Sequence, residues 1–232
     1  MPRKNPIVSI IITNYNYGKY ISRAIRSCLN QSMSDHIEVI IIDDASQDNS
    51  VNIINEIFSS DEIVKIFLKE NKGVAYCSNL GIKRASGMYV MRVDADDYIH
   101  YKMVEFLFEF LNMNNEFAFS YCDHIRVNEN EVKSERINLD SEKKLLDHGA
   151  GILFKKSHLE SIGLYDEEMR NCEDMLLLKK LLQNNFKGIH VPIPFYRYYR
   201  HDNNMTNDIE EREKWTNEMQ KRMSTETISK DN

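Results

Sequence analysis

The segment IVSIIITNYNYG at residues 7–18 decides the class of fold that we expect from this sequence. Residues 7–13 form a nearly continuous apolar run, which is typical of a strand buried on both faces of a parallel sheet. The run ends abruptly in polar residues, and residues 18–30 then place apolar side chains at helical spacing. The segment therefore predicts a buried strand, a polar loop and an amphipathic helix.

This order of strand and helix recurs over the first hundred residues. Three more apolar runs stand at residues 38–43, 63–68 and 88–94, and helical patterns begin near residues 46 and 74. Such alternation predicts an α/β fold in which parallel strands are joined by right-handed crossovers. In sheets of this kind, ligands bind outside the carboxyl ends of the strands.

The remainder of the chain has a less regular pattern. It predicts a helix at 102–113, a long strand at 116–127, a polar surface excursion at 128–147, a strand at 148–156, an amphipathic helix at 173–185 and two short strands at 186–191 and 194–201. From residue 206 the chain is polar, apart from a few apolar residues. We expect Trp215, Met219 and Met223 to pack on the core, with a second subunit or a membrane surface as alternatives, and the last residues to be frayed.

The composition is that of a soluble globular protein. Of the 232 residues, 42% are hydrophobic and 28% are charged, and the net charge is −6 without a long basic run. Nucleic-acid binding is therefore not expected. The four cysteines form no CxxC pair, and no apolar stretch reaches the roughly 20 residues that cross a bilayer. We expect a cytoplasmic protein with reduced thiols, and peripheral contact with the inner face of a membrane stays open.

Polar clusters follow three of the predicted strands. They are Thr13 to Tyr15 after the first strand, Asp43 and Asp44 after the second, and Asp94, Asp96 and Asp97 after the fourth. Because the carboxyl ends of parallel strands meet at one edge, we expect these side chains to converge on one crevice. Carboxylates this close repel unless a cation or hydrogen bonds compensate their charge. Mg²⁺ or Mn²⁺ would fit the DADD motif at 94–97, and a solvated turn or helix cap is the alternative.

Other candidate residues also have a structural interpretation. Asp43 and Asp44 could cap the next helix, and Tyr15 could be a core aromatic instead of stacking on a base. Glu173 and Asp174 begin a predicted helix, where acidic residues complement the helix dipole. The sequence has no GxGxxG after the first strand and no GxxxxGK[ST], which argues against a dinucleotide fold and a P-loop.

Five segments together resemble the family 2 glycosyltransferases of the GT-A fold. They are VSIIITNYNYGKYISRAIRSCLNQS (8–32), EVIIIDDASQDNS (38–50), NKGVAYCSNLGIKRASGMYVMRVDADD (71–97), GLYDEEMRNCEDMLLLKKLL (163–182) and YRYYRHDNNMT (196–206). The resemblance implies an α/β GT-A (nucleotide-diphospho-sugar transferase) fold, with a mostly parallel central sheet flanked by helices and a smaller mixed sheet on the acceptor side. It also implies a single domain at 1–205, with a nucleotide-sugar half at 6–99 and an acceptor half at 100–205. A helical or partly disordered tail at 206–232 would follow.

The same resemblance implies roles for individual residues. By this resemblance Thr13 and Tyr15 would contact the nucleotide base, Asp44, supported by Asp43, would read the base edge, and Asp94 would contact the ribose or sugar. Asp96 and His201 are similar to the family's metal ligands. Asp174, with Glu173 beside it, is similar to the catalytic base, and Arg197 or Arg200 would contact the diphosphate. Asp97 adjoins this motif as an assisting residue. The acceptor is expected near His148 to Gly151 and around Asp166 to Asp174, where glycines such as Gly149 let a bulky ligand approach the backbone. Ser78 replaces an arginine common in relatives, so Lys72 or Arg84 would have to contact phosphate in its place.

The reaction implied is sugar transfer with inversion of configuration. The donor would be a nucleoside-diphosphate sugar, with a UDP-sugar as first choice, and Mn²⁺ or Mg²⁺ would be the cofactor. The acceptor would be a hydroxyl group of a glycan or lipid-linked saccharide in polysaccharide or glycoconjugate synthesis. Two alternatives remain open, namely a sugar-nucleotide-forming nucleotidyltransferase and a non-catalytic nucleotide-binding relative, and homo-oligomerisation is also open.

Overall fold

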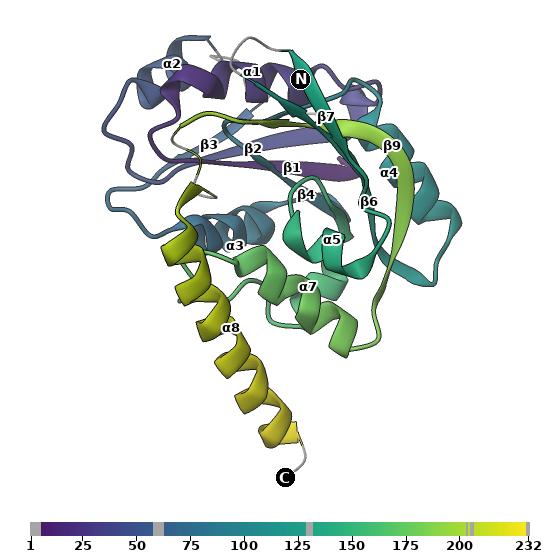
Figure 1. The fold of residues 1–232 in the computed structure, drawn as a ribbon. Coiled ribbons are helices and arrows are strands. Elements are labelled where there is room, and N and C mark those ends of the chain that lie inside the picture. Colours follow the sequence, from purple (N-terminus) through teal and green to yellow (C-terminus); the bar gives the residue numbers. More distant parts are fainter. Residues whose placement is uncertain (1–5, 58–62, 129–131, 203, 205–206, 231–232) are drawn as a thin grey trace.

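A computed structural model describes residues 6–57, 63–128, 132–202, 204 and 207–230 (Figure 1). Its first part is a parallel sheet with connecting helices. The strands are β1 (Val8–Asn14), β2 (Ile37–Asp43), β3 (Ile63–Phe67) and β4 (Tyr89–Asp94), and the helices are α1 (Gly18–Leu29), the 3₁₀ turn η1 (Ser34–His36), α2 (Ser50–Ile57) and α3 (Val74–Arg84). β1 pairs in parallel with β2 and β4, and β2 with β3. The predicted α/β class is confirmed.

The second part adds antiparallel and mixed pairings to the same sheet. Its elements are β5 (Tyr98–Ile99), α4 (Met103–Met113), β6 (Phe117–Val127), β7 (Lys133–Ile137), α5 (Glu142–Asp147), β8 (Leu153–Lys155), α6 (Lys156–Ser161), α7 (Glu173–Gln183), β9 (Lys187–Tyr199) and α8 (Ile209–Lys230). The strand order is β3-β2-β1-β4-β8-β6-β9-β5, and β7 pairs with β6. β8 is antiparallel to both β4 and β6, so the strands that were expected to form a smaller separate sheet continue the central one.

Three parts of the second half differ from the sequence-based prediction. The polar excursion at 128–147 contains β7 and α5 in its described part. The two short strands at 186–201 are one strand, β9, which pairs with β6 through register shifts around Asp123. Pro192 falls within these shifts, where a proline does not interrupt the hydrogen-bond ladder. The last helix, α8, continues to Lys230, beyond the start of the tail predicted to fray.

Helices cover both faces of the sheet because its central strands are apolar on both faces. Alternate residues of β1 point to opposite sides, so that Ile10 and Ile12 pack with α1, α2 and α4, whereas Ile11 packs with α3, α6 and α7. Figure 1 shows α3 and α7 on the same side of the strands, away from α1 and α2. The core is therefore two apolar layers that hold the strand ends rigidly.

Helix α8 is attached to the domain by a small apolar cluster. Met219 is buried against Met169 and Leu176 of α7, and Trp215 and Met223 pack against this cluster. The predicted packing of these residues on the core is confirmed. In the described part of the chain, no helix is long and apolar enough to span a bilayer.

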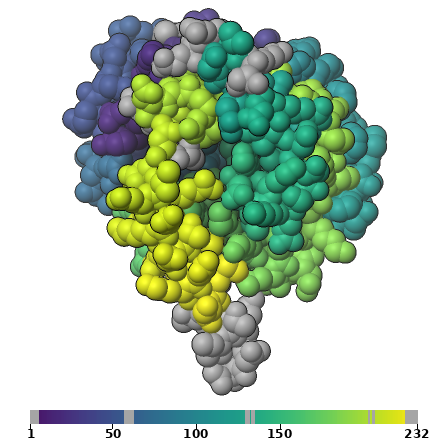
Figure 2. All heavy atoms as spheres, in the orientation of Figure 1, coloured from purple at the N-terminus to yellow at the C-terminus, as the bar shows by residue number. Residues whose placement is uncertain are grey.

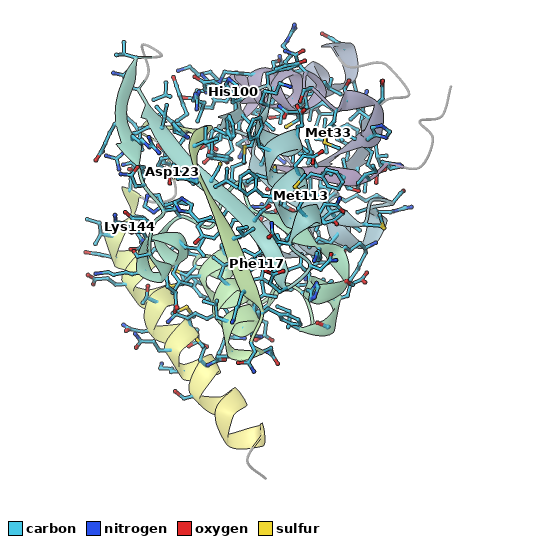
Figure 3. All side chains as sticks on the ribbon, turned by 90° about the vertical axis from the view of Figure 1, so that its right-hand side faces the viewer. Met33, His100, Met113, Phe117, Asp123 and Lys144 are labelled. Carbon is cyan, nitrogen blue, oxygen red and sulfur yellow. The ribbon has the colours of Figure 1, made fainter. Side chains whose placement is uncertain are left out.

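A buried carboxylate joins three segments of the mixed half. Asp123 of β6, labelled in Figure 3, is 1% exposed and accepts hydrogen bonds from Arg136 Nη2 (2.6 Å) and the Leu139 amide (2.8 Å). Its other contact is His190 Nε2 of β9, at 2.7 Å. Burial alone would raise the pKa of Asp123, but these hydrogen bonds outweigh it and hold the pKa below its usual value. The carboxylate is therefore an ionised cross-link between β6, β7 and β9.

We expect Asp123→Asn to lower the free energy of unfolding by about 1–3 kcal/mol at pH 7, because an amide group meets donors that a carboxylate satisfied. A depressed folded-state pKa stabilises the fold above the unfolded-state pKa, and this contribution disappears as the pH falls through the folded-state pKa. The difference from wild type in urea titrations should therefore shrink towards pH 3. Asp140→Asn, at a side chain that is 57% exposed, is the control and should change stability little. A loss that does not depend on pH would contradict this account.

Candidate functional site

A cavity of about 660 Å³ opens at the carboxyl ends of β1, β2 and β4. Its far wall is built from α5, the segment that follows it, and the start of α7. Figure 2 shows α8, in yellow, beside the teal-green segment that contains α5, in agreement with the ion pair of Arg212 Nη2 and Asp147 Oδ1 (3.3 Å). The predicted residues that line the cavity are Thr13, Tyr15, Asp44, Asp94, Asp96, Gly149, Glu173, Asp174 and Arg200. The predicted convergence of distant segments on one crevice is thus observed.

The pairing of the strands brings the polar ends of β1, β2 and β4 together. Thr13 lies beside Asp94, and Asn14 lies beside Asp43. Asp43 does not line the cavity, since it accepts hydrogen bonds from Asn14 Nδ2 (2.7 Å) and the Ser46 amide (2.9 Å). The supporting role expected for Asp43 is therefore indirect, because it joins the loops after β1 and β2.

Asp44 lines the cavity, and its carboxylate also holds the loop that precedes α3. Its two carboxylate oxygens accept the backbone amides of Lys72 (2.7 Å) and Gly73 (2.8 Å) ahead of α3. Gly73 has a φ of +89°, and a Cβ there would lie 2.2 Å from the Arg170 guanidinium. Tyr15 is 45% exposed at the rim, so it is not a core aromatic and its ring is available to a planar ligand.

The DADD turn is not a solvated turn, since its carboxylates have different protein partners. Asp96 is 8% exposed, and its Oδ2 contacts His201 Nε2 (3.0 Å) and Asn204 Nδ2 (3.1 Å). Asp97 is 1% exposed and accepts the Tyr199 amide (2.8 Å), so it faces β9 and does not line the cavity. Burial and the charges of Asp96 and Asp94 raise the pKa of Asp97 well above its usual value. The expected assisting contact of Asp97 with substrate is not supported by this placement.

Arg92 is the cation that compensates the other carboxylates of the site. This side chain is 9% exposed and projects from β4, where its Nε lies 3.1 Å from Asp94 Oδ1 and its Nη1 lies 2.9 Å from Glu173 Oε1. Its Nη2 forms an ion pair with Asp174 Oδ2. Burial acts against the charge of Arg92, but the carboxylates around it outweigh that effect and raise its pKa. One guanidinium thus connects the end of β4 to the start of α7.

Asp174 lies in the first turn of α7 and does not cap the helix. The residue before the helix, Cys172, is in the left-handed region (φ 59°) and makes no side-chain capping bond. Burial raises the pKa of Asp174 to about 8; Arg92 opposes this rise, and Glu173 adds to it. A carboxyl group with a raised pKa in a cavity is suited to accept a proton near neutral pH.

The backbone at Gly149 leaves no room for a side chain next to Asp174. A Cβ at Gly149 would lie 2.3 Å from Asp174 Cβ, so any larger residue would displace Asp174. The backbone at 149 therefore forms the surface against which Asp174 is positioned. A glycine is required at 149 because the backbone there lies so close to Asp174, and not only because a ligand needs room.

Asp96 and His201 offer a carboxylate oxygen and an imidazole nitrogen 3.0 Å apart. Adjacent ligands of an octahedral ion with bonds of about 2.1 Å lie about 3 Å apart, so this pair fits a divalent cation. Asp96 lines the cavity, whereas His201 is buried behind it. Among the described residues no group of three or more His, Cys, Asp or Glu is arranged to hold a metal. Two protein ligands are typical where phosphate oxygens complete the coordination.

The basic residues at the cavity differ from those expected. Arg200 lines it, and its Nη2 donates to Asn207 Oδ1 (2.6 Å), but Arg197 and Arg84 do not line it. The Ser78 hydroxyl donates to the Val74 carbonyl within α3 (2.7 Å), which leaves phosphate contact to other residues. The Lys72 side chain forms an ion pair with Glu70 outside the cavity.

Sequence reasoning missed Arg92 and Arg170, which line the cavity. The signal for Arg92 was present in YVMRVD at 89–94, where a charged residue interrupts a buried strand. A buried arginine requires partners, so it predicts a cluster of carboxylates nearby. For Arg170 there was no such signal, because it lies in a polar loop.

We expect Arg92→Met to lower the free energy of unfolding by about 3–5 kcal/mol at pH 8, because it leaves three carboxylates in a buried site without their cation. The loss should be smaller at pH 5, where Asp174, whose pKa is about 8, is protonated and the repulsion is weaker. Urea unfolding followed by circular dichroism at both pH values measures this difference. Arg92→Lys keeps the positive charge but lacks the planar guanidinium, so its stability should lie between those of the wild type and Arg92→Met. Equal losses at both pH values would show that the guanidinium acts through packing alone.

Comparisons with known proteins agree with this geometry. The sequence model described as "Glycosyl transferase family 2" matches residues 9–205. A protein of Haemophilus influenzae described as an uncharacterized glycosyltransferase is 35% identical over 148 residues, which are 62% of this chain and 56% of that protein. A chondroitin synthase of Pasteurella multocida is 37% identical over 123 residues, 53% of this chain and 13% of that protein. The chain thus spans about half or less of the length of these curated relatives.

Solved structures share the fold at low sequence identity. Residues 1–349 of TarS from S. aureus, in complex with UDP-GlcNAc, align with a TM-score of 0.74 and 20% identity over 87% of this chain and 60% of that chain. The mannosyltransferase PcManGT from Pyrobaculum calidifontis, in complex with GDP-Man and Mn²⁺, aligns with a TM-score of 0.69 and 19% identity over 87% of this chain and 59% of that chain. The expected GT-A fold is confirmed, and the chain belongs to glycosyl transferase family 2.

Proposed function

We propose that this domain transfers a sugar from a nucleoside-diphosphate sugar to a hydroxyl group of a saccharide acceptor, with inversion of configuration. The observation that carries the proposal is the arrangement around Arg92. It holds Asp94, at the end of a strand that faces the donor side, within one ion-pair cluster with Asp174 on the opposite wall. A donor contact and a general base are thereby fixed on either side of the same cavity.

The donor half is proposed to be the crevice formed by the ends of β1, β2 and β4. Tyr15 at the rim would stack on the base, Asp44 and Thr13 would bind the nucleoside, and Asp94 would contact the ribose or sugar. A UDP-sugar is the first choice of donor. It is supported by a structural neighbour in complex with UDP-GlcNAc, although another neighbour is in complex with GDP-Man.

Asp96 and His201 are proposed to hold Mn²⁺ or Mg²⁺. When bound, the cation would neutralise the leaving diphosphate as a Lewis acid. Arg200 and Arg170 line the same cavity and would bind the phosphoryl oxygens from its wall. Together these side chains supply the positive charge that the donor requires in a protein of net charge −6.

Asp174 is proposed to be the general base. It would accept the proton of the acceptor hydroxyl as that oxygen forms a bond to the anomeric carbon and the bond to the diphosphate breaks. Attack from the face opposite the leaving group inverts the configuration in one displacement. General-base assistance of this kind typically contributes about 10²–10⁴-fold in rate. Arg92 would hold the carboxylate in place, and the backbone at Gly149 would position it.

The acceptor is proposed to enter beside Gly149, and the acceptor half of the domain would extend over residues 100–205. A glycan or a lipid-linked saccharide in polysaccharide or glycoconjugate synthesis fits this role. A cytoplasmic location, with peripheral contact at the inner face of the membrane, remains part of the proposal. Homo-oligomerisation also remains open.

We expect a panel of nucleotide sugars to release nucleoside diphosphate only with Mn²⁺ or Mg²⁺, with UDP-sugars giving the highest rates. Asp174→Asn should reduce turnover at least about 100-fold, because the acceptor loses its base. Its affinity for UDP, measured by calorimetry with Mg²⁺, should remain near that of the wild type. Pyrophosphate release from a nucleoside triphosphate would favour a nucleotidyltransferase instead. Near-normal turnover of Asp174→Asn would overturn the assignment of the base.

The raised pKa of Asp174 makes the reaction dependent on pH. A base must be deprotonated, so kcat/KM should rise with pH up to about 8, the pKa of Asp174 in the free enzyme. Burial and the charge of Glu173 raise this pKa. Glu173→Gln should therefore move the rising limb of the plot of kcat/KM against pH to lower pH. Glu160→Gln, at a surface side chain that is 54% exposed, is the control and should leave the limb in place. An unmoved limb in Glu173→Gln would argue that another group titrates.

A further inference from the structure

Two histidines of the cavity wall have no role in the mechanism proposed above. His124 of β6 is 1% exposed and lines the cavity. Neither of its ring nitrogens has a hydrogen-bond partner of normal geometry, although the Ala150 backbone lies near enough to favour the protonated ring. Buried polar atoms are nearly always satisfied in folded proteins. The ring is therefore a candidate to bind a ligand.

His148 lies next to this ring and also lines the cavity. The two ring centroids are 5.9 Å apart with an interplanar angle of 62°, and His148 Nδ1 is likewise buried without a hydrogen-bond partner. The other face of His124 packs against the Tyr196 ring, with centroids 4.7 Å apart. Both ring nitrogens of His124 and Nδ1 of His148 thus lack a hydrogen-bond partner of normal geometry, although the Lys144 backbone lies near enough to His148 to favour its protonated ring.

The histidine pair is adjacent to the proposed base. His148 immediately precedes Gly149, whose Cα supports Asp174 so closely that a Cβ would be 2.3 Å from Asp174 Cβ. An acceptor whose hydroxyl group reaches Asp174 would therefore place its neighbouring hydroxyl groups near the two rings. This location separates the pair from the donor contacts at the ends of β1 and β2.

The surroundings of both rings favour the neutral form. Burial lowers the pKa of His124 to about 3, and the neighbouring His148 adds to this effect. Burial also lowers the pKa of His148, Asp147 opposes the shift, and Arg126 and Arg212 support it. Both arginines and Asp147 also line the cavity, and the arginines form ion pairs with Glu135 (2.6 Å) and Asp147 (3.3 Å) that offset their charges.

A neutral imidazole has one donor and one acceptor nitrogen, and a hydroxyl group likewise donates and accepts. Carboxylate oxygens only accept, so a carboxylate could accept the single N–H of each ring but would leave the other ring nitrogen without a donor. A pair of neutral rings that offers both donors and acceptors, flanked by arginines whose charges are paired, is suited to sugar hydroxyl groups in preference to an anionic group.

We propose that His124 and His148 form a subsite that binds hydroxyl groups of the accepting sugar, and that this sugar is uncharged. The inference rests on the proposed function, because it assigns the acceptor to the wall beside Asp174. It adds the class of acceptor, namely a neutral saccharide unit in preference to a uronic acid or a sugar phosphate. It also assigns the residues that select it.

The test measures binding of simple acceptor analogues to the protein saturated with UDP and Mg²⁺. The probes are methyl glucoside, methyl N-acetylglucosaminide and methyl glucuronide, titrated by ligand-observed NMR. At least one neutral glycoside should bind at least 10-fold more tightly than the glucuronide. His124→Phe and His148→Phe should each weaken that binding at least 10-fold. His158→Phe, at a histidine of α6 outside the cavity lining whose Nδ1 is also unpartnered, is the matched control and should leave it unchanged.

A second measurement needs no variant. Ring ¹⁵N signals of His124 and His148 should shift when the neutral glycoside is added, and those of His158 should not. Equal affinity for the glucuronide, no glycoside binding, or unchanged binding in both variants would overturn the subsite. A failure of UDP to bind with Mg²⁺ would instead overturn the proposed function, so the two failures are distinguishable.

Discussion

The site depends on one buried guanidinium. Arg92 lies among Asp94, Glu173 and Asp174, and each of these carboxylates comes from an element that is fixed by the core. Without a cation, three carboxylates in a low-dielectric pocket would repel and take up protons. With it, the end of β4 and the start of α7 are held at a fixed separation. The cavity between them therefore has a defined width before any ligand enters.

The division of charge across the cavity follows from this constraint. Arg92 pairs with Asp94 at the end of β4 and with Glu173 and Asp174 at the start of α7, whereas Asp96 Oδ2 contacts His201 and Asn204. A divalent cation and the arginines of the wall would then meet the diphosphate, and the base would remain apart from them. The uncharged surface formed by His124 and His148 belongs to neither group, which is why it suggests selection of a neutral sugar.

Whether an element pairs locally or with a distant strand explains which parts of the fold were predictable from the sequence. Apolar runs that alternate with amphipathic helices are local patterns, so the parallel half and its polar strand ends were predictable from spacing alone. The mixed half was harder because its pairings are not local. Pro192 made β9 look like two strands, although it falls at the register shifts between β6 and β9. The polarity of 128–147 likewise concealed β7, which pairs with β6 alone among the described strands and is therefore an edge strand with a solvated face.

The sequence by itself determined the class of fold, the family and the set of polar residues that gather at the strand ends, because these follow from periodicity and from motifs of contiguous residues. Only the tertiary structure decided which member of each pair faces the cavity. Asp44 and Asp96 line the cavity, whereas their neighbours Asp43 and Asp97 turn inward to backbone amides. Adjacent side chains diverge at the end of a strand, and their directions depend on partners that are far away in the chain. For the same reason the roles proposed for Arg92 and His124 depend on the residues that surround them in the folded chain.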